Sequence, residues 1–482
     1  MFRLYKLRYT KVFLLGALAV ISIYGCVPTR DVREEKTALP DKFGEIQSKD
    51  TLNTANLNWR EFFQDPQLIA LIDTALVNNQ ELNIMLQQVS MAKNEIRARK
   101  GEYLPSVNIG AAAEVEKVGR YTSQGASDAN TDIRPGEEFP EPLPGYSVGA
   151  FASWEIDVWK KLRNSKKAAV MEYLSTVEGK NFMITNLISE IAESYYELQA
   201  LDNELAIIEQ NLEIQANALK TLKLQKQAAK ATELGVRRFQ AEVLKNQSEL
   251  YEVKQEITET ENKLNFLIGR TPKPIQRSSN DFLEKKMDSI STGIPSQLLQ
   301  NRPDIRQAEF ELAAAKLDTR VARANFYPSF AINAGVGLEA FSTKFLTSTP
   351  ESLLYYLAGD MVAPLINRNA IKAEYATAND RQLQAIFEYE KTILNAFIEV
   401  KNGVSRIENL RKSYELKEQQ VEALTESIEL TNKLFRSARA DYLEVLLTQR
   451  ESLESRMELV ETRKDQLLAR VTLYKNLGGG WK

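Results

Sequence analysis

The sequence predicts a mostly α-helical fold with a small β part, built by tandem duplication. Three observations predict it: a motif that occurs twice, long proline-free segments with helical periodicity, and short segments in which apolar and polar residues alternate. The chain has 482 residues, of which 43% are hydrophobic and 26% are charged. This composition is ordinary for a folded protein, yet no Pro/Gly/Ser-rich linker divides the chain into separate globular blocks.

The N-terminus has the composition of an export signal, which we assign to residues 1–25. Basic residues lie among the first eleven positions, and residues 12–23 form an apolar run too short to span a bilayer comfortably. The run ends at Ile23-Tyr24-Gly25-Cys26, which resembles the lipobox of bacterial lipoproteins. Cys26 is the only cysteine in the sequence, so an intrachain disulfide is impossible and we expect covalent lipidation of Cys26. The alternatives are an ordinary signal-peptidase site and an uncleaved anchor.

The second half of the chain repeats the first. The motif at residues 98–106 reappears at residues 322–329, and its two Pro-Ser pairs lie 223 positions apart (328 − 105). Further on, Leu267 is matched to Leu477 at an offset of 210 (477 − 267). After the signal we therefore predict four parts: an N-terminal segment 26–66, a first repeat 67–270, a linker 271–294 and a second repeat 295–482.

Each repeat contains a segment that alternates with the period of a β-strand. We predict hairpins within residues 105–158 and 328–366; the alternation is broken at Phe151 and is poor between residues 353 and 365. Strands of about ten residues with one apolar face are typical of transmembrane barrels, although a soluble sandwich core would use the same residues. Four strands are too few to close a barrel, and an open edge in lipid leaves backbone groups unpaired, so closure demands other subunits.

Each hairpin is preceded by a helical segment, 67–100 or 295–325, and followed by a much longer one. Between residues 160 and 228 there is no proline, and apolar residues recur at spacings of three and four; residues 370–437 repeat this pattern. A helix of nearly seventy residues is on the order of 100 Å long. Shorter helices, 232–267 and 441–477, complete the two repeats. Such lengths suit a duct or a rod.

The composition also excludes several classes of function. There are no histidines, which rules out histidine-based catalytic triads and the usual zinc sites. The net charge of −3 gives no nucleic-acid footprint. No phosphate-binding loop or activated nucleophile is found. We therefore expect no enzyme activity, no catalytic residue, no metal site and no cofactor beyond the lipid on Cys26.

Six motifs carry a resemblance to a known family. They are Trp59 to Pro66, Asn301 to Ile305, Tyr327-Pro328-Ser329, Tyr389-Glu390-Lys391, Tyr442 to Leu446, and Leu473 to Trp481. Each is weak alone, but together they occur in one order along almost the whole mature chain. On these residues the sequence resembles the TolC-like outer-membrane efflux factors, in the lipoprotein branch that serves resistance-nodulation-division (RND) pumps. We expect the Arg-Pro-Asp and Gly-Gly-Gly-Trp motifs to stabilise turns and helix ends.

The resemblance implies a homotrimer. Each chain would supply four strands to a twelve-stranded outer-membrane β-barrel, while the long helices form a periplasmic α-barrel. The N-terminal segment, the linker and the C-terminus would form a girdle around it. The implied function is a passive exit duct for small molecules (drugs, toxic compounds or metal ions), driven by an inner-membrane RND pump through a periplasmic adaptor. The implied location is the outer membrane of a diderm bacterium, with a lipid anchor.

The resemblance also places two periplasmic tips, at residues 228–234 and 437–443. Adaptor contacts are expected at Ala229, Thr232, Leu234, Ala438, Tyr442 and Leu443. The family usually has glycine where Ala229 and Ala438 stand. Because glycine permits a positive φ and alanine pays a steric penalty there, we expect tighter helical reversals at both turns.

The candidates for a channel constriction are Arg436, Arg439 and Asp441. One hypothesis is that Asp441 pairs with a neighbouring arginine and holds the closed state. The alternative is that Asp441 is the N-cap of a solvated helix end.

Two other functions fit part of the sequence. An exit duct for type I protein secretion shares the fold, but the lipobox and the Gly-Gly-Gly-Trp motif favour the drug or metal branch. A non-conducting structural envelope lipoprotein would use the long helices, but it has no need for the alternating strand segments. The cargo cannot be read from the sequence, because a wide wet tunnel recognises its contents weakly.

Overall fold

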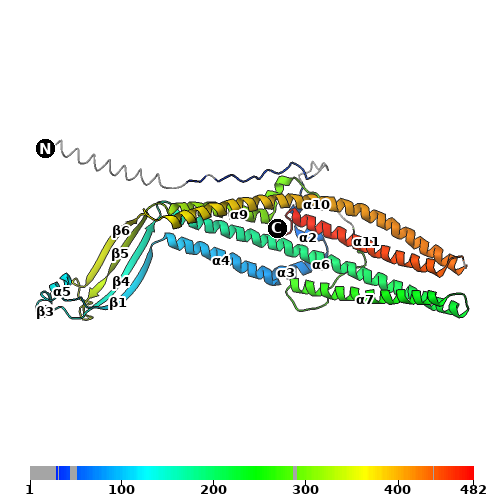
Figure 1. Ribbon diagram of the computed structural model, residues 1–482, viewed down its shortest axis with the longest axis horizontal. Coiled ribbons are helices and arrows are strands. Elements are labelled where there is room, and N and C mark those ends of the chain that lie inside the picture. The colour runs from blue at the N-terminus through cyan, green and yellow to red at the C-terminus, as the bar shows by residue number, and fades with distance from the viewer. Residues whose placement is uncertain (1–28, 31, 44–51, 286–289, 438) are drawn as a thin grey trace. The chain divides into compact units, whose positions relative to one another are not determined.

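The computed structural model describes residues 29–30, 32–43, 52–285, 290–437 and 439–482 (Figure 1). Cys26 and Ala438 lie outside the described residues. The fold is mostly helical with one small principal sheet, as predicted. The chain divides into two compact units. Of the described residues, the sheet unit comprises those within 29–34, Ser90–Leu174 and Phe310–Phe387, and the helix unit comprises those within Glu35–Val89, Ser175–Glu309 and Glu388–Lys482.

The sheet unit is organised around four antiparallel strands. In spatial order they are β1 (Ser106–Glu116), β4 (Leu143–Ile156), β5 (Ser329–Ala340) and β6 (Leu353–Val362). The central pair, β4 and β5, joins a strand of the first repeat to a strand of the second, so Gly149 lies opposite Gly337. The compact units therefore do not follow the sequence repeats, because both repeats contribute to one sheet.

The two hairpin connections differ in content. The first contains α5 (Ser123–Asp128) and a small ribbon of β2 (Asp132–Arg134) and β3 (Glu137–Glu138). The second spans only residues 341–352. The two connections meet where the Arg134 guanidinium lies 4.2 Å from the centre of the Phe345 ring.

The helices that precede the hairpins are interrupted, unlike the predicted continuous segments. In the first repeat, α3 (Pro66–Asn78) ends at Asn79, and α4 (Gln80–Tyr103) begins there. The Asn79 side chain accepts a hydrogen bond from the Leu82 N–H and donates one to the Leu267 carbonyl. Asparagine is suited to this position because its side chain can replace the missing helical backbone bonds. In the second repeat, α8 (Leu298–Asn301) precedes α9 (Pro303–Ala324).

The long helices are α6 (Lys161–Gln227) and α10 (Asn369–Arg436), of 67 and 68 residues. Their shorter companions are α7 (Glu233–Leu267) and α11 (Tyr442–Asn476), of 35 residues each. Figure 1 shows α7 running beside α6 and α11 beside α10. The predicted apolar stripe of α6 forms the core of the helix unit, where Ile191, Tyr195 and Leu198 are fully buried against α3 and its neighbours. No described helix combines the length and the apolar character needed to cross a bilayer.

A short helix, α2 (Trp59–Phe63), lies in the same core. The Phe62 ring stacks on the Tyr474 ring of α11 with centroids 4.1 Å apart, and the Tyr474 hydroxyl donates to the Leu57 carbonyl. The first and last motifs of the sequence are thereby packed together.

Candidate functional site

The predicted tip of the first repeat is a Schellman turn at the C-terminus of α6. The Lys230 N–H donates to the Gln225 carbonyl at 2.8 Å, and the Ala229 N–H donates to the Lys226 carbonyl at 2.9 Å. Ala229 has a φ of 55°. This is the left-handed conformation that glycine usually supplies. The expectation of a tighter reversal is therefore wrong at this tip: the alanine accepts a steric cost of about 1 kcal/mol instead of changing the turn.

The second tip has the same backbone hydrogen bond, which joins an N–H to the carbonyl five positions earlier. The Arg439 N–H donates to the Leu434 carbonyl at 2.9 Å, which is the Lys230 bond displaced by 209 residues (439 − 230). Ala438 and the side chain of Arg436 lie outside the described residues, so their predicted roles stay predictions. The offset of 209 also separates Gly269 from Gly478, the left-handed residues after α7 and α11. The sequence offset of 210 is therefore one residue too long.

Each return helix begins with a side-chain cap. The Thr232 hydroxyl accepts from the Gly235 N–H at 3.1 Å, and the Asp441 carboxylate accepts from the Tyr442 N–H at 2.6 Å. In the single chain Asp441 is thus the N-cap of its helix, which was the alternative to the ion pair. An ion pair of Asp441 with a neighbouring arginine in the closed state stays a prediction, as does the constriction role of Arg439.

The tips share a small apolar cluster, formed by Leu222, Val236, Phe239, Val243 and Leu446. Tyr442 packs beside this cluster and over Gly235, where an added Cβ would lie 2.7 Å from the ring. The predicted adaptor residues divide accordingly. Ala229, Thr232 and Leu234 are exposed, the last by 61%, whereas Tyr442 and Leu443 are half-buried. Adaptor contact stays a prediction for all of them.

An ion-pair chain that the sequence analysis missed crosses the first tip. Glu233 pairs with Lys226 on the other side of the turn and with Arg237, at 2.8 Å, one helical turn along α7. The hydrogen bond from Lys226, assisted by Arg237, lowers the pKa of the exposed Glu233 carboxyl. The pattern Glu233-x-x-x-Arg237 could have predicted the second contact. Only the turn geometry reveals the first.

At the opposite ends of the helix pairs, where α7 and α11 finish, a glycine packs against another backbone segment. A Cβ at Gly269 would lie 2.3 Å from the Asn78 carbonyl oxygen, and one at Gly478 would lie 2.5 Å from the Asn301 carbonyl oxygen. Both glycines also have a positive φ. Here glycine is required twice, for its conformation and for its lack of a side chain.

The Arg-Pro-Asp motif holds the end of α11. The buried Arg302 guanidinium pairs with Asp304 and Glu399, each at 2.7 Å, and donates to the Asn476 carbonyl at 3.0 Å. The Trp481 indole N–H donates to the carbonyls of Asn301 and Gly478. Both motifs therefore bind helix ends and turns, as expected from the sequence.

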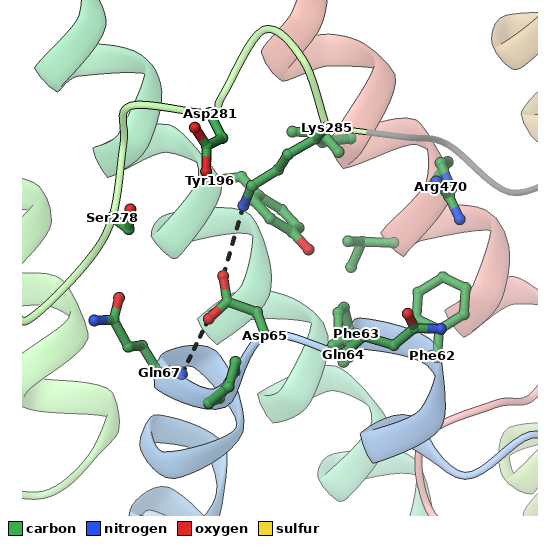
Figure 2. Close-up of a pocket in the computed structure, with 13 residues that line it drawn as sticks. Phe62, Phe63, Gln64, Asp65, Gln67, Tyr196, Ser278, Asp281, Lys285 and Arg470 are labelled. Atoms are coloured by element: carbon green, nitrogen blue, oxygen red, sulfur yellow. Dashed lines mark hydrogen bonds and ion pairs between the residues drawn. The ribbon is translucent and has the colours of Figure 1, made fainter.

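A pocket of about 510 Å³ lies in the helix unit beside the Asp65-Pro66 motif (Figure 2). Asp65 caps α3 through the Gln67 N–H, and Lys285 of the linker reaches toward it at 3.6 Å. Lys285 also donates to Gln199, and burial lowers the pKa of its ammonium despite the attraction of Asp65. The contacts of Lys285 with Asp65 and Gln199 fasten the linker to the core, which sequence reasoning did not foresee.

The sheet presents one apolar and one largely polar face. Directly opposed residues of antiparallel strands share a face, so the register places Ile109, Ala150, Val336 and Tyr355 together on the first. This face is open: Ile109 is 85% exposed and Leu357 is 79% exposed. The second face carries Ser106, Ser153 and Asn333 in one row, and glycines of three strands in another. The predicted alternation is therefore observed.

Comparison with known proteins gives one consistent result. The family model "Outer membrane efflux protein" matches residues 71–270 and 294–479. The pyoverdine export outer membrane protein OpmQ of Pseudomonas aeruginosa is 28% identical over 424 residues, covering 88% of this chain and 87% of OpmQ. The cation efflux system protein CusC of Escherichia coli is 26% identical over 474 residues, covering 97% and 99%.

The solved structure of the open Neisseria gonorrhoeae MtrE outer membrane channel shares the fold. Its TM-score is 0.83 at 23% identity, over 95% of this chain and 99% of MtrE. These relatives are export and channel proteins rather than enzymes. Because the family model matches both repeats over most of the sequence, the chain belongs to the outer membrane efflux protein family, as an outer-membrane channel component that extends into the periplasm.

Proposed function

We propose that three copies of this chain form the exit duct of a tripartite efflux system, in which an RND pump drives small molecules into the duct through a periplasmic adaptor. The sheet is the observation that carries this proposal. Its apolar face, with Ile109 and Leu357, is exposed in the single chain. Each such side chain gains about 2 kcal/mol when it is transferred from water to an apolar environment. Lipid is the environment that suits an apolar face of this extent.

The edges of the sheet support the trimer. In the described part of the chain, β1 and β6 each pair on one side only. In lipid, every unpaired N–H or C=O on such an edge costs several kcal/mol. Because the sheet has four antiparallel strands, β1 and β6 run in opposite directions. The β1 strand of one copy can therefore pair antiparallel with the β6 strand of the next. Three copies give a closed ring in which all edges are paired.

The helix unit adds a second, independent indication of neighbouring subunits. Ile207 of α6 is 8% exposed, whereas its counterpart Leu416 in α10, 209 positions later, is 67% exposed. Among the described side chains between residues 401 and 435, none is buried. A neighbouring copy packed against this stretch of α10 would cover it. The exposed leucines Leu430 and Leu434 follow on the same helix.

The remaining parts of the proposal concern the anchor and the cargo. We infer that Cys26 is lipidated, that no other cofactor is needed, and that the chain performs no catalysis. The relatives are named for pyoverdine, cations and toluene, which fits a duct whose cargo is chosen by its pump. We therefore assign drugs, toxic compounds or metal ions as the cargo class. A mature N-terminus without acyl mass in a mass spectrum would contradict the anchor.

The proposal is tested by deleting the gene in its host and restoring it on a plasmid. We expect the deletion strain to become sensitive to dyes, detergents or metal salts, and the restored gene to reverse this. Crosslinking in living cells should recover this chain with an adaptor and an RND pump. Recovery of a transporter ATPase with a secreted protein would instead support type I secretion. Unchanged sensitivity, with no pump recovered, would contradict both.

A further inference from the structure

The polar face of the sheet carries two features that a plain conduit does not require: two aromatic rings and a one-sided set of charges. We propose that this face forms a weak subsite for flat organic cations on the inner wall of the barrel. The inference rests on the proposed function, because a trimeric barrel with its apolar face in lipid turns the polar face toward the bore.

The rings belong to Phe151 and Tyr356. They occupy one row of the sheet, in the order Asn108, Phe151, Gly335, Tyr356. A Cβ at Gly335 would lie 2.4 Å from the Tyr356 ring and 3.0 Å from the Phe151 ring. Both rings therefore lie against the backbone of β5, on either side of a residue that must be glycine. Phe151 is the residue that broke the predicted alternation.

Two further glycines extend this cradle across the neighbouring strands. A Cβ at Gly149 would lie 3.3 Å from the Phe151 ring, and one at Gly110 would lie 3.6 Å from it. The Phe151 ring therefore covers backbone of three strands and does not project away from the wall. Tyr356 is 43% exposed and Phe151 is partly exposed. In the proposed barrel, rings held in this way offer a flat π surface to the bore.

The charges on the same face are all negative. The four strands contain five ionisable acids and, within these described ranges, no lysine or arginine; the acids are Glu114, Glu116, Glu155, Glu339 and Asp360. The register places every one of them on the polar face. Asp360 accepts from Asn333 at 2.6 Å, and Glu155 lies 3.8 Å from Lys161 at the start of α6.

The rings and the carboxylates favour the same ligand. Aromatic faces attract cations, and most strongly those that have shed part of their water, as organic cations do. Asp360 stands four residues from Tyr356 on β6 and on the same face. A strand rises about 3.3 Å per residue, so this carboxylate lies roughly 13 Å along the strand and acts on a cation stacked on the ring through its electrostatic field. A flat anion would meet the same ring but would be repelled. Binding must remain weak, because a duct has to release its cargo.

The test is single-channel recording of the purified protein in a planar bilayer of phosphatidylethanolamine and phosphatidylglycerol. Ethidium is the flat cation, fluorescein is the matched flat anion, and potassium carries the current. We expect brief blocks of the potassium current by ethidium and none by fluorescein. In the double variant Phe151→Leu, Tyr356→Leu, the ethidium affinity should fall about two- to fivefold, while the open-channel potassium conductance changes little.

Two control variants separate the rings from general damage to the sheet. Tyr356→Phe keeps the ring and should keep the block. Asp360→Asn should weaken both the ethidium block and the preference for potassium over chloride, whereas Glu138→Gln in the hairpin connection should change neither. Normal potassium conductance with an unchanged ethidium block in the double variant would overturn the subsite alone, as would equal block by fluorescein. Absence of any conductance from the unsubstituted protein would overturn the proposed duct and the subsite with it.

Discussion

The two ends of each helix pair use one backbone turn in two different environments. At the tip end, where α6 and α10 finish, the left-handed residue of the first turn is the exposed Ala229. At the girdle end, where α7 and α11 finish, it is Gly269 or Gly478, each packed against another backbone segment. The difference shows that hydrogen bonds alone do not dictate glycine. Packing does.

The comparison also separates a locked end from an adjustable one. At the girdle end, buried Arg302 ties α11 to Asp304 and Glu399. At the tip end, the side-chain ion pairs at the first turn are the exposed ones of Glu233, which contribute little in water. If the tips of the proposed duct open, this asymmetry assigns the movement to the exposed ion pairs of the first turn and leaves the buried Arg302 contacts in place.

Removal of the girdle lock should have the largest effect. Arg302→Leu leaves the carboxylates of Asp304 and Glu399 without their buried partner, and we expect a loss of about 3 kcal/mol of unfolding free energy. Denaturant unfolding of the detergent-solubilised protein measures this. The control is Arg411→Leu, whose exposed pairs with Glu408 and Glu415 should contribute less than about 1 kcal/mol. Equal losses would contradict the locked end.

Gly478→Ala should cost about 2 kcal/mol in the same assay. The added methyl group meets the Asn301 carbonyl and also suffers the left-handed backbone penalty. The matched control is Gly101→Ala in α4, where nothing lies within 4 Å of the new Cβ. We expect that change to be neutral or slightly stabilising, because alanine favours a helix. A neutral Gly478→Ala would refute the packing argument.

Asp441→Ala removes the cap of α11 and should cost about 1 kcal/mol. Asp441→Asn keeps a capping oxygen but loses the charge, so it should retain most of the stability. If an ion pair of Asp441 with a neighbouring arginine also holds the closed state, both variants should raise the open probability in bilayer recordings. Unchanged gating in both would leave the cap as the role of Asp441 and refute the latch.

Ala229→Gly should stabilise the first tip slightly, by about 0.5 kcal/mol. Glycine relieves the left-handed strain, but it also increases the entropy of the unfolded chain, so the two effects partly cancel. The thermal midpoint of the purified protein reports the sign. A clear loss of stability would mean that Ala229 makes contacts beyond those of the single chain.

The smallest effect concerns pH. Because Lys226 lowers the pKa of Glu233 in the folded state, the ion pair stabilises the tip above the ordinary pKa of glutamate, and this contribution is lost as the pH falls through the lowered pKa. The difference in thermal midpoint between the unsubstituted protein and Glu233→Gln should therefore be present at neutral pH and vanish in acid. A difference that grows in acid would contradict the assignment.

The sequence predicted the regular elements well and the joints poorly. Periodicity located the long helices and the strands, because burial on one face imposes it. It did not show the break at Asn79, where one capping side chain outweighs helical continuity. It was wrong about the first tip, because a steric preference of about 1 kcal/mol at Ala229 is too small to redirect the turn. The Asp65–Lys285 contact joins residues 220 positions apart (285 − 65) and leaves no local signal.

The most direct measurement is stepwise conductance after the purified protein is added to a planar bilayer, with one substitution on each face of β1. Trimeric insertion through four strands per chain predicts discrete steps for the unsubstituted protein. Ile109→Asp, which places a charge on the apolar face, should sharply reduce the number of steps, and Asn108→Asp on the opposite face should preserve them. Absence of steps from the unsubstituted protein, or equal insertion by both variants, would contradict a pore that is built from this sheet.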